Sequence, residues 1–212
     1  SYREVLGDFR TGKLDILVGT QMIAKGLDFP NVTLVGVLFA DLALHLPDFR
    51  AGERTFQMLT QVAGRAGRGD VAGEVIVQTY TPHHPAIQAV RRFDLEGFYE
   101  QELAFRRELE YPPFTRLTCL TARGADRAAV AGYMERLAEA LRRAAAEADG
   151  AVKVSDAAPA PFERIQGQYR QQVIVRAADA RAMNRAIRAA VLAEKKPSGV
   201  LLLIDVDALS LL

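Results

Sequence analysis

The sequence predicts an α/β protein built in two parts, on three observations. Short runs rich in apolar residues at 15–18, 32–38 and 74–79 alternate with helical stretches, which favours a parallel sheet buried on both faces. Beyond residue 114 the expected elements run strand, helix, strand, strand, helix, strand, which is the split βαβ order. Two prolines at Tyr111–Pro113 stop the helix before them. We therefore expect a lobe at 1–82, a connecting helix at 83–113 and a split βαβ domain at 114–212.

Composition limits the class of protein. Half of the 212 residues are apolar and the net charge is +1, so there is material for two small cores and no strongly basic character. No run of eighteen apolar residues occurs, and the first residues, SYREVLGDFR, are charged from the third position. The single cysteine, Cys119, excludes an internal disulfide and is expected as a small buried residue. We expect a cytoplasmic protein without a membrane span.

The first lobe begins with an amphipathic helix at residues 2–11, closed by Gly12, and a strand at 15–18. A glycine and Thr20 follow that strand, and the breakers Gly26, Asp28 and Pro30 precede the strand at 32–38. Ligands of parallel sheets collect at the carboxyl ends of strands, where free N–H groups and helix N-termini meet anions. Thr20 and Asp28 are expected at such an end.

The stretch RTFQMLTQVAGRAGRG, residues 54–69, carries the most informative pattern. On a helix, one stripe holds three guanidiniums and two amides and no carboxylate, from Arg54, Gln57, Gln61, Arg65 and Arg68. Phe56, Leu59 and Ala63 lie roughly opposite and are expected to pack. Gly64 and Gly67 predict either a close approach to the backbone or the end of the helix.

This pattern leaves two interpretations open. The stretch is either a solvated surface helix with GRAGRG as its glycine stop, or it carries Arg65 and Arg68 as a pair that neutralises charge on a transferring phosphoryl group. Spacing alone does not separate them.

Residues 86–110 predict one long amphipathic helix, with Phe98, Leu103, Phe105 and Leu109 among its apolar positions. A turn is expected before it at Thr81–Pro85, because its two histidines lack further metal ligands nearby. The final domain is expected to have strands at 115–122, 152–158, 169–177 and 200–206 and helices at 125–148 and 179–193. It contains no phosphate-binding glycine loop, so docking is expected of it rather than chemistry.

Two stretches together resemble a known family. GTQMIAKGLDFPNVTLVGV at residues 19–37 and QVAGRAGRG at 61–69 resemble the fifth and sixth motifs of superfamily 2 helicases. DFRAGERTFQMLTQVAGRAGRG, then HPAI, ELAFRREL and YPPF, are similar to the primosomal replication-restart DNA helicases, from about residue 10 to the C-terminus. The resemblance implies a partial RecA-like second helicase lobe, an S10-like C-terminal domain, and an ATP-dependent DNA helicase that binds branched DNA in primosome assembly.

The resemblance also implies roles for single residues. Gln61, Arg65 and Arg68 would face the phosphates of ATP, which is held with Mg²⁺ by a first lobe outside these residues. Gly26 and Asp28 would lie beside the ribose and the interlobe cleft. Thr20 would touch a phosphate of the DNA track.

In the last domain the resemblance implies contacts with branched or single-stranded DNA, with single-stranded DNA-binding protein and with other primosome proteins. Tyr169, Arg170 and Gln172 fit the family's basic-aromatic strand, whereas Gln168 and Gln171 depart from it. The alternative for this strand is an edge strand with a polar face.

Several family features are missing from this sequence. The family's zinc-binding cysteine pairs and a GxxxxGK[ST] loop do not occur, so we expect the chain alone not to hydrolyse ATP. The alternative function is a non-catalytic docking module for DNA or single-stranded DNA-binding protein. An RNA helicase is disfavoured, because the split βαβ tail matches the primosomal family.

Overall fold

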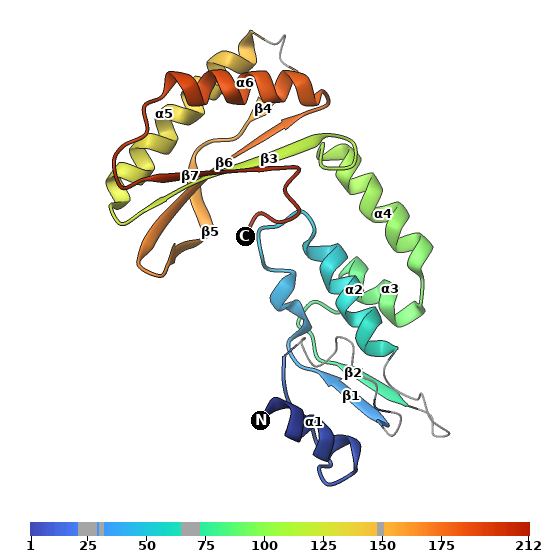
Figure 1. Cartoon of the computed structure of the whole chain (residues 1–212). Helices are drawn as coiled ribbons and strands as arrows, with labels where there is room; N and C mark the ends of the chain where they lie inside the picture. Colours follow the sequence, from blue (N-terminus) through green and yellow to red (C-terminus); the bar gives the residue numbers. More distant parts are fainter. Residues whose placement is uncertain (21–28, 30–31, 65–72, 148–150) are drawn as a thin grey trace. The chain divides into compact units, whose positions relative to one another are not determined.

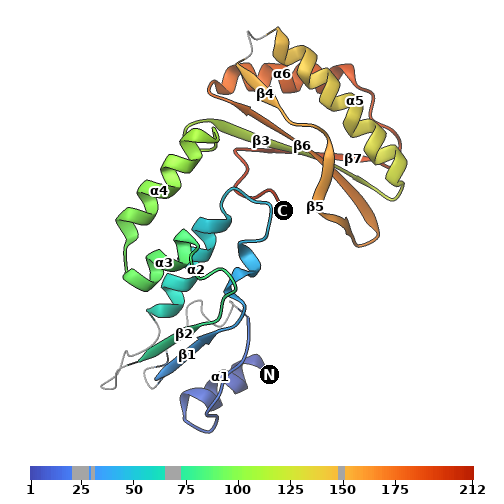
Figure 2. The ribbon, with the colours of Figure 1, turned by 180° about the vertical axis from the view of Figure 1, so that it is seen from behind.

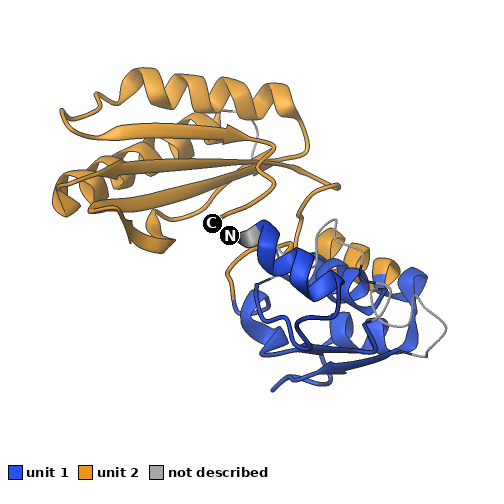
Figure 3. Ribbon diagram, turned by 60° about the horizontal axis from the view of Figure 1, so that its bottom comes forward, with its two compact units in different colours: residues 1–45, 51–98 blue, residues 46–50, 99–212 orange. Residues whose placement is uncertain are grey.

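The computed structural model describes residues 1–20, 29, 32–64, 73–147 and 151–212. The chain divides into two compact units (Figure 3). The first unit comprises Ser1–His45 and Ala51–Phe98, and the C-terminal unit comprises Leu46–Arg50 and Tyr99–Leu212. The C-terminal unit therefore includes five residues from within the stretch that forms the first.

The first unit contains a parallel pair of strands, as the sequence predicts. Strands β1 (Leu34–Val37) and β2 (Glu74–Val77) pair in parallel, with Leu34 opposite Glu74. Figure 1 also labels three helices of this unit, α1 (Tyr2–Arg10), α2 (Ala51–Ala63) and α3 (Pro85–Arg92). A 3₁₀ helix, η2 (Ala40–Ala43), lies between β1 and α2 in the sequence. Ser1 caps α1 in a capping box with Glu4, which satisfies N–H groups at the helix start.

Two expectations for this sheet are wrong. Residues 15–18 form no strand, and the side chains of Ile16 and Val18 are 79% and 85% exposed. Strands β1 and β2 are not buried on both faces, since Leu34 and Ile76 are 55% and 52% exposed. A strand needs a neighbour to complete its backbone ladder. Among the described residues, the sheet of this unit consists of β1 and β2 alone.

The single helix expected at residues 86–110 is two helices, α3 and α4 (Leu95–Glu108). The break lies at Phe93, which caps α3 in the left-handed region with φ 54°, and at Asp94, whose carboxylate accepts a hydrogen bond from the backbone N–H of Gly97. This short polar side chain competes for the helical backbone donors, which favours a new helix start. Of the expected apolar positions of α4, Phe98 is buried, whereas Leu103, Phe105 and Leu109 are exposed.

The C-terminal unit confirms the predicted split βαβ order. Its sheet is antiparallel, with order β4-β6-β3-β7 and with β5 pairing β6. The strands are β3 (Arg116–Gly124), β4 (Val152–Val154), β5 (Ala158–Ile165), β6 (Gln168–Ala177) and β7 (Leu201–Val206). The strand expected at 152–158 is in fact β4 and the start of β5. Gln166 and Gly167 join β5 to β6 with φ of 50° and 80°, a conformation that suits a tight hairpin.

Two helices cover one face of this sheet. Figures 1 and 2 both show α5 (Arg127–Ala146) and α6 (Ala180–Ala193) on the same side of the strands. Each begins at an aspartate, Asp126 or Asp179, whose carboxylate accepts backbone N–H groups of the first turn. Those hydrogen bonds lower the pKa of Asp179.

The core of the C-terminal unit lies between these helices and the sheet. Its fully buried members include Leu120, Val130, Met134, Leu137 and Val173. A second, smaller cluster around Leu117 lies on the other face of the sheet and includes Cys119, which is buried as expected. None of the described helices is both long and apolar enough to cross a membrane.

Candidate nucleotide and DNA interface

Helix α2 packs with the face that the sequence predicts. Phe56 is 4% exposed and stacks on Phe98 with ring centroids 4.2 Å apart, and Leu59 is 2% exposed in a cluster with Ala40 and Ile87. Gln61 lies on the exposed side of the same helix. The helix therefore fixes the direction of Gln61 by burying the opposite face.

A carboxylate lies next to the predicted stripe. Glu53 precedes Gln57 by one turn, and its Oε1 accepts a hydrogen bond of 3.0 Å from Gln57 Nε2. A carboxylate therefore borders the stripe at its N-terminal end, where positions i and i+4 of a helix are neighbours. Glu53 also stands in the first turn, where a negative charge stabilises the helix N-terminus.

Helix α2 ends at Ala63, and the N–H of Gly64 donates to the carbonyl of Thr60 over 3.0 Å. The glycine thus marks the end of the helix, one of the two outcomes expected for it. Arg65, Arg68, Gly26 and Asp28 lie outside the described residues. Thr20 is exposed and belongs to no helix or strand.

Sequence reasoning missed a buried carboxylate beside the carboxyl ends of β1 and β2. Asp41 of η2 is fully buried and accepts hydrogen bonds from Thr79 Oγ1 (2.7 Å), from the N–H groups of Tyr80 (2.9 Å) and Thr81 (3.0 Å), and from Thr81 Oγ1. Burial raises the pKa of Asp41, but these hydrogen bonds outweigh it and hold the pKa well below its usual range. The carboxylate fixes the exit of β2 to the loop after β1.

A signal for Asp41 was present in the sequence. An aspartate three residues after the expected strand at 32–38, with threonines at the end of the next parallel strand, places an acceptor beside several donors. Its partners are 38 to 40 residues away, so local periodicity does not reveal them.

Tyr169, Arg170 and Gln172 lie on β6, and the alternative of an edge strand is wrong. Strand β6 pairs with β3 on one side and with β4 and β5 on the other. Arg170 stands opposite Arg123 of β3. Like charges directly opposite are unfavourable, which makes this face of the sheet attractive to an anion.

Tyr169 points to the other side of β6 from Arg170, because successive side chains alternate. Guanidiniums of Arg164 and Arg127 lie 5.1 and 6.0 Å from the centre of its ring. Gln172 is half-buried and its Oε1 accepts a weak hydrogen bond from Cys119 Sγ over 3.9 Å. The three predicted residues therefore share a strand but not one face.

Two family models match the chain. The helicase conserved C-terminal domain matches residues 2–70, and the primosomal protein N C-terminal domain matches residues 107–209. The replication restart protein PriA of Bacillus subtilis is 49% identical over 83% of this chain, that of Synechocystis sp. is 42% identical over 100%, and that of Treponema pallidum is 42% identical over 99%. The chain belongs to the PriA family.

This PriA-family chain spans 22%, 25% and 32% of the lengths of those three relatives. Thr20 and Gln61 fall within its match to the helicase domain, and Tyr169, Arg170 and Gln172 fall within its match to the primosomal domain. Among solved structures, the de novo designed protein Foldit4 is 14% identical with a TM-score of 0.35, over 43% of this chain and 94% of its own.

Proposed function

We propose that this PriA-family chain is the C-terminal part of an ATP-dependent DNA helicase that binds branched DNA and restarts replication forks. The observation that carries the proposal is helix α2. It buries Phe56 and Leu59, presents Gln61 on the exposed side, and lies within the match to the helicase domain. It leads directly into Arg65 and Arg68 of QVAGRAGRG.

In this proposal Arg65 and Arg68 are arginine fingers. Their planar guanidiniums suit phosphate oxygens, and the amide of Gln61 supplies a further donor and acceptor. ATP bound with Mg²⁺ supplies the phosphoryl group whose transfer to water drives movement. Gly26 and Asp28 would border the ribose and the cleft between lobes. We further propose that the protein acts in the cytoplasm.

The metal sites of the family are proposed to lie elsewhere in the longer protein. No group of three His, Cys, Asp or Glu side chains suited to a metal occurs in the part of the chain that the structure describes. Cys119 is the only cysteine and is buried, so it does not offer a zinc site.

We propose that Thr20 contacts a phosphate of the DNA track. The Thr20 side chain is exposed. A hydrogen bond from its hydroxyl to a DNA phosphate does not depend on the base sequence, as is required of a helicase that moves along DNA of any sequence. In the longer protein, Thr20→Ala should lower DNA stimulation of ATP turnover with a smaller effect on nucleotide affinity. Steady-state turnover with and without forked DNA measures this, and unchanged stimulation would remove Thr20 from the DNA track.

For the C-terminal unit we propose contacts through Tyr169, Arg170 and Gln172. The paired guanidiniums of Arg170 and Arg123 favour an anionic partner, either branched or single-stranded DNA or an acidic segment of single-stranded DNA-binding protein. Other primosome proteins are further proposed partners. By function we divide the chain into a helicase lobe at 1–82, a connecting segment at 83–113 and a docking domain at 114–212.

The test compares two lengths of protein. The longer protein should hydrolyse ATP faster when forked DNA is added, and these 212 residues alone should not hydrolyse it, because the sequence contains no GxxxxGK[ST] loop. Fork binding without any turnover by the longer protein would favour the alternative, a docking module. Turnover by these residues alone would contradict the division of the ATP site between two lobes.

A further inference from the structure

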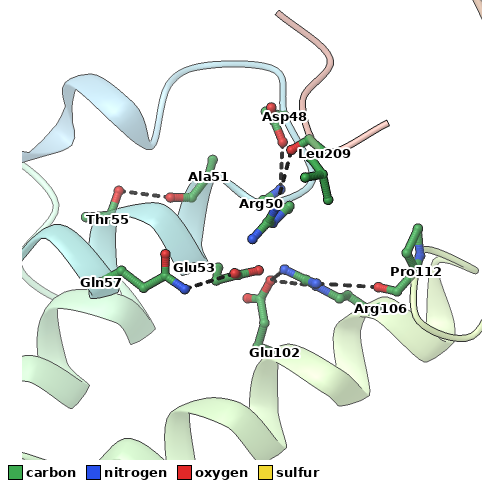
Figure 4. A network of polar contacts seen from close by, with 10 residues as sticks. All are labelled: Asp48, Arg50, Ala51, Glu53, Thr55, Gln57, Glu102, Arg106, Pro112 and Leu209. Carbon is green, nitrogen blue, oxygen red and sulfur yellow. Dashed lines mark hydrogen bonds and ion pairs between the residues drawn. The ribbon is translucent and has the colours of Figure 1, made fainter. Parts of the chain in front are cut away.

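The C-terminal unit holds five residues, Leu46–Arg50, whose neighbours on both sides in the chain belong to the first unit. Arg50 is followed directly by Ala51, the first residue of α2. A movement of these five residues is therefore transmitted to the first residue of α2 through the peptide bond between Arg50 and Ala51. Figure 4 shows two residues of the segment, Asp48 and Arg50, with the carbonyl of Leu209, and also the pair formed by Arg106 and Glu102 of α4.

Asp48 is the most buried residue of the segment, at 8% exposure. Its Oδ1 accepts the N–H of Arg50 over 2.9 Å, and its Oδ2 accepts Ser210 Oγ over 3.0 Å and the N–H of Leu211 over 3.1 Å. A buried carboxylate is costly unless it is hydrogen-bonded, so this arrangement holds the segment to residues 210–211 specifically.

The residues on each side of Asp48 add further attachments. Arg50 Nη1 donates to the carbonyl of Leu209 over 3.4 Å. Phe49 stacks on Tyr111, with ring centroids 5.1 Å apart and planes 4° from parallel. The guanidinium of Arg106 lies 5.3 Å from the centre of the Phe49 ring, on an arginine whose side chain is 12% exposed and paired with Glu102 over 2.8 Å.

Tyr111 also contacts an arginine of the sheet. Arg176 of β6 lies 4.9 Å from the centre of the Tyr111 ring, and its Nη1 donates to the carbonyl of Leu109 over 2.6 Å. Phe49, Tyr111 and Arg176 thus form a continuous series of contacts from the segment Leu46–Arg50 to β6. Strand β6 also carries Tyr169 and Arg170. These contacts make a contiguous physical path, which energetic coupling between two sites generally uses.

We propose that Leu46–Arg50 is a tether through which the C-terminal unit positions helix α2 for ATP turnover, with Asp48 as the positioning residue. The proposal rests on the proposed function of α2 and extends it. A fork bound at the C-terminal unit changes turnover through this tether.

The experiment uses the longer protein with Asp48→Ala, Ser210→Ala and a matched control, Asp156→Ala. Asp156 is another carboxylate of the C-terminal unit, but its side chain is 96% exposed and paired with Arg142. Turnover is measured with and without forked DNA, together with the KM for ATP and the Kd for the fork. Hydrogen exchange is measured on the unliganded protein.

With Asp48→Ala, DNA-stimulated kcat should fall about 10-fold, while turnover without DNA and the KM for ATP change by no more than about twofold. Ser210→Ala should give a smaller loss, because it removes the hydroxyl donor and leaves the N–H donors of Arg50 and Leu211 to Asp48. Amides of residues 46–56 should exchange faster in Asp48→Ala, with β3 and α5 unchanged. Asp156→Ala should match the parent protein in every measurement.

Two results would overturn the tether. One is faster exchange at residues 46–56 with unchanged DNA stimulation, and the other is an equal loss of basal and stimulated turnover with faster exchange throughout the C-terminal unit. If the parent protein shows no DNA-stimulated turnover at all, the proposed function fails. The role of the tether in turnover fails with it. Unchanged exchange at residues 46–56 in Asp48→Ala, in a parent protein that does show DNA-stimulated turnover, would overturn the tether while leaving the proposed function intact.

Discussion

The two compact units differ in how their sheets are covered. In the C-terminal unit, Leu120, Val173 and Val175 are fully buried beneath α5 and α6. In the first unit, strands β1 and β2 leave Leu34 and Ile76 more than half exposed. The C-terminal unit therefore buries its apolar side chains within this chain, whereas the first unit presents apolar strand surface.

That difference fits the coverage of the relatives. The chain spans 22% to 32% of the lengths of the three PriA relatives described above. We expect other parts of the longer protein to cover the exposed strands of the first unit, because parallel sheets occur almost only with both faces covered. The predictions below compare matched positions in the two units.

The largest difference should come from leucines. Leu137 of α5 is fully buried, so Leu137→Ala should lower the free energy of unfolding of the C-terminal unit by roughly 2–5 kcal/mol, from lost transfer energy and a cavity. Leu34→Ala in β1 removes a side chain that is 55% exposed and should cost no more than about 0.5 kcal/mol. Denaturant unfolding of the chain measures both, and equal losses would contradict the comparison.

Strand glycines should give a smaller difference. A Cβ on Gly124 of β3 would lie 2.7 Å from the carbonyl oxygen of Gly199 and 3.1 Å from Val130 Cγ2, so Gly124→Ala should destabilise the C-terminal unit by about 1–3 kcal/mol. A Cβ on Gly36 of β1 would meet nothing within 4 Å among the described residues. Gly36→Ala should be neutral or slightly stabilising. Thermal unfolding of the two variants tests this, and a stable Gly124→Ala protein would show that the strands separate more easily than expected.

The smallest effect should be the acid dependence of the first unit. The pKa of Asp41 is lowered in the folded state, so its contribution to stability is present above its unfolded pKa of about 3.9 and is lost as pH falls toward the folded value. Asp41→Asn should remove this loss of stability in acid from the first unit, as well as destabilising it at neutral pH.

Asp179 and Glu110 of the C-terminal unit also have lowered pKa values, from backbone N–H groups and from Lys153 respectively. The acid dependence of that unit should therefore survive in Asp41→Asn. Hydrogen exchange between pH 2 and 6, read separately in β2 and β3, distinguishes the units. An unchanged pH slope in β2 would show that Asp41 is not responsible.

The sequence predicts those features that local patterns determine. The order of the C-terminal elements apart from one additional strand, the parallel pairing of β1 with β2 and the buried face of α2 at Phe56 and Leu59 were predicted correctly. In each case the period of apolar residues selects the element, and burial of that face stabilises it.

The features that the sequence did not predict depend on partners distant in the chain or on single backbone positions. Apolar residues at 15–18 predicted a strand that has no ladder in this chain, and Phe93 ends α3 inside a pattern that reads as one helix. Asp48 is held by residues 162 and 163 positions later, a contact that no local pattern contains. The predicted arginines of the site remain a prediction.

The most direct test of the account is ATP turnover by the longer protein carrying Arg68→Ala. A matched control is Arg143→Ala in α5, which removes an arginine that is 66% exposed and paired with Glu194. We predict that Arg68→Ala lowers DNA-stimulated turnover by about 10³-fold or more with fork affinity unchanged, and that Arg143→Ala changes neither. Parent-like turnover in Arg68→Ala would contradict a role for the end of α2 in hydrolysis.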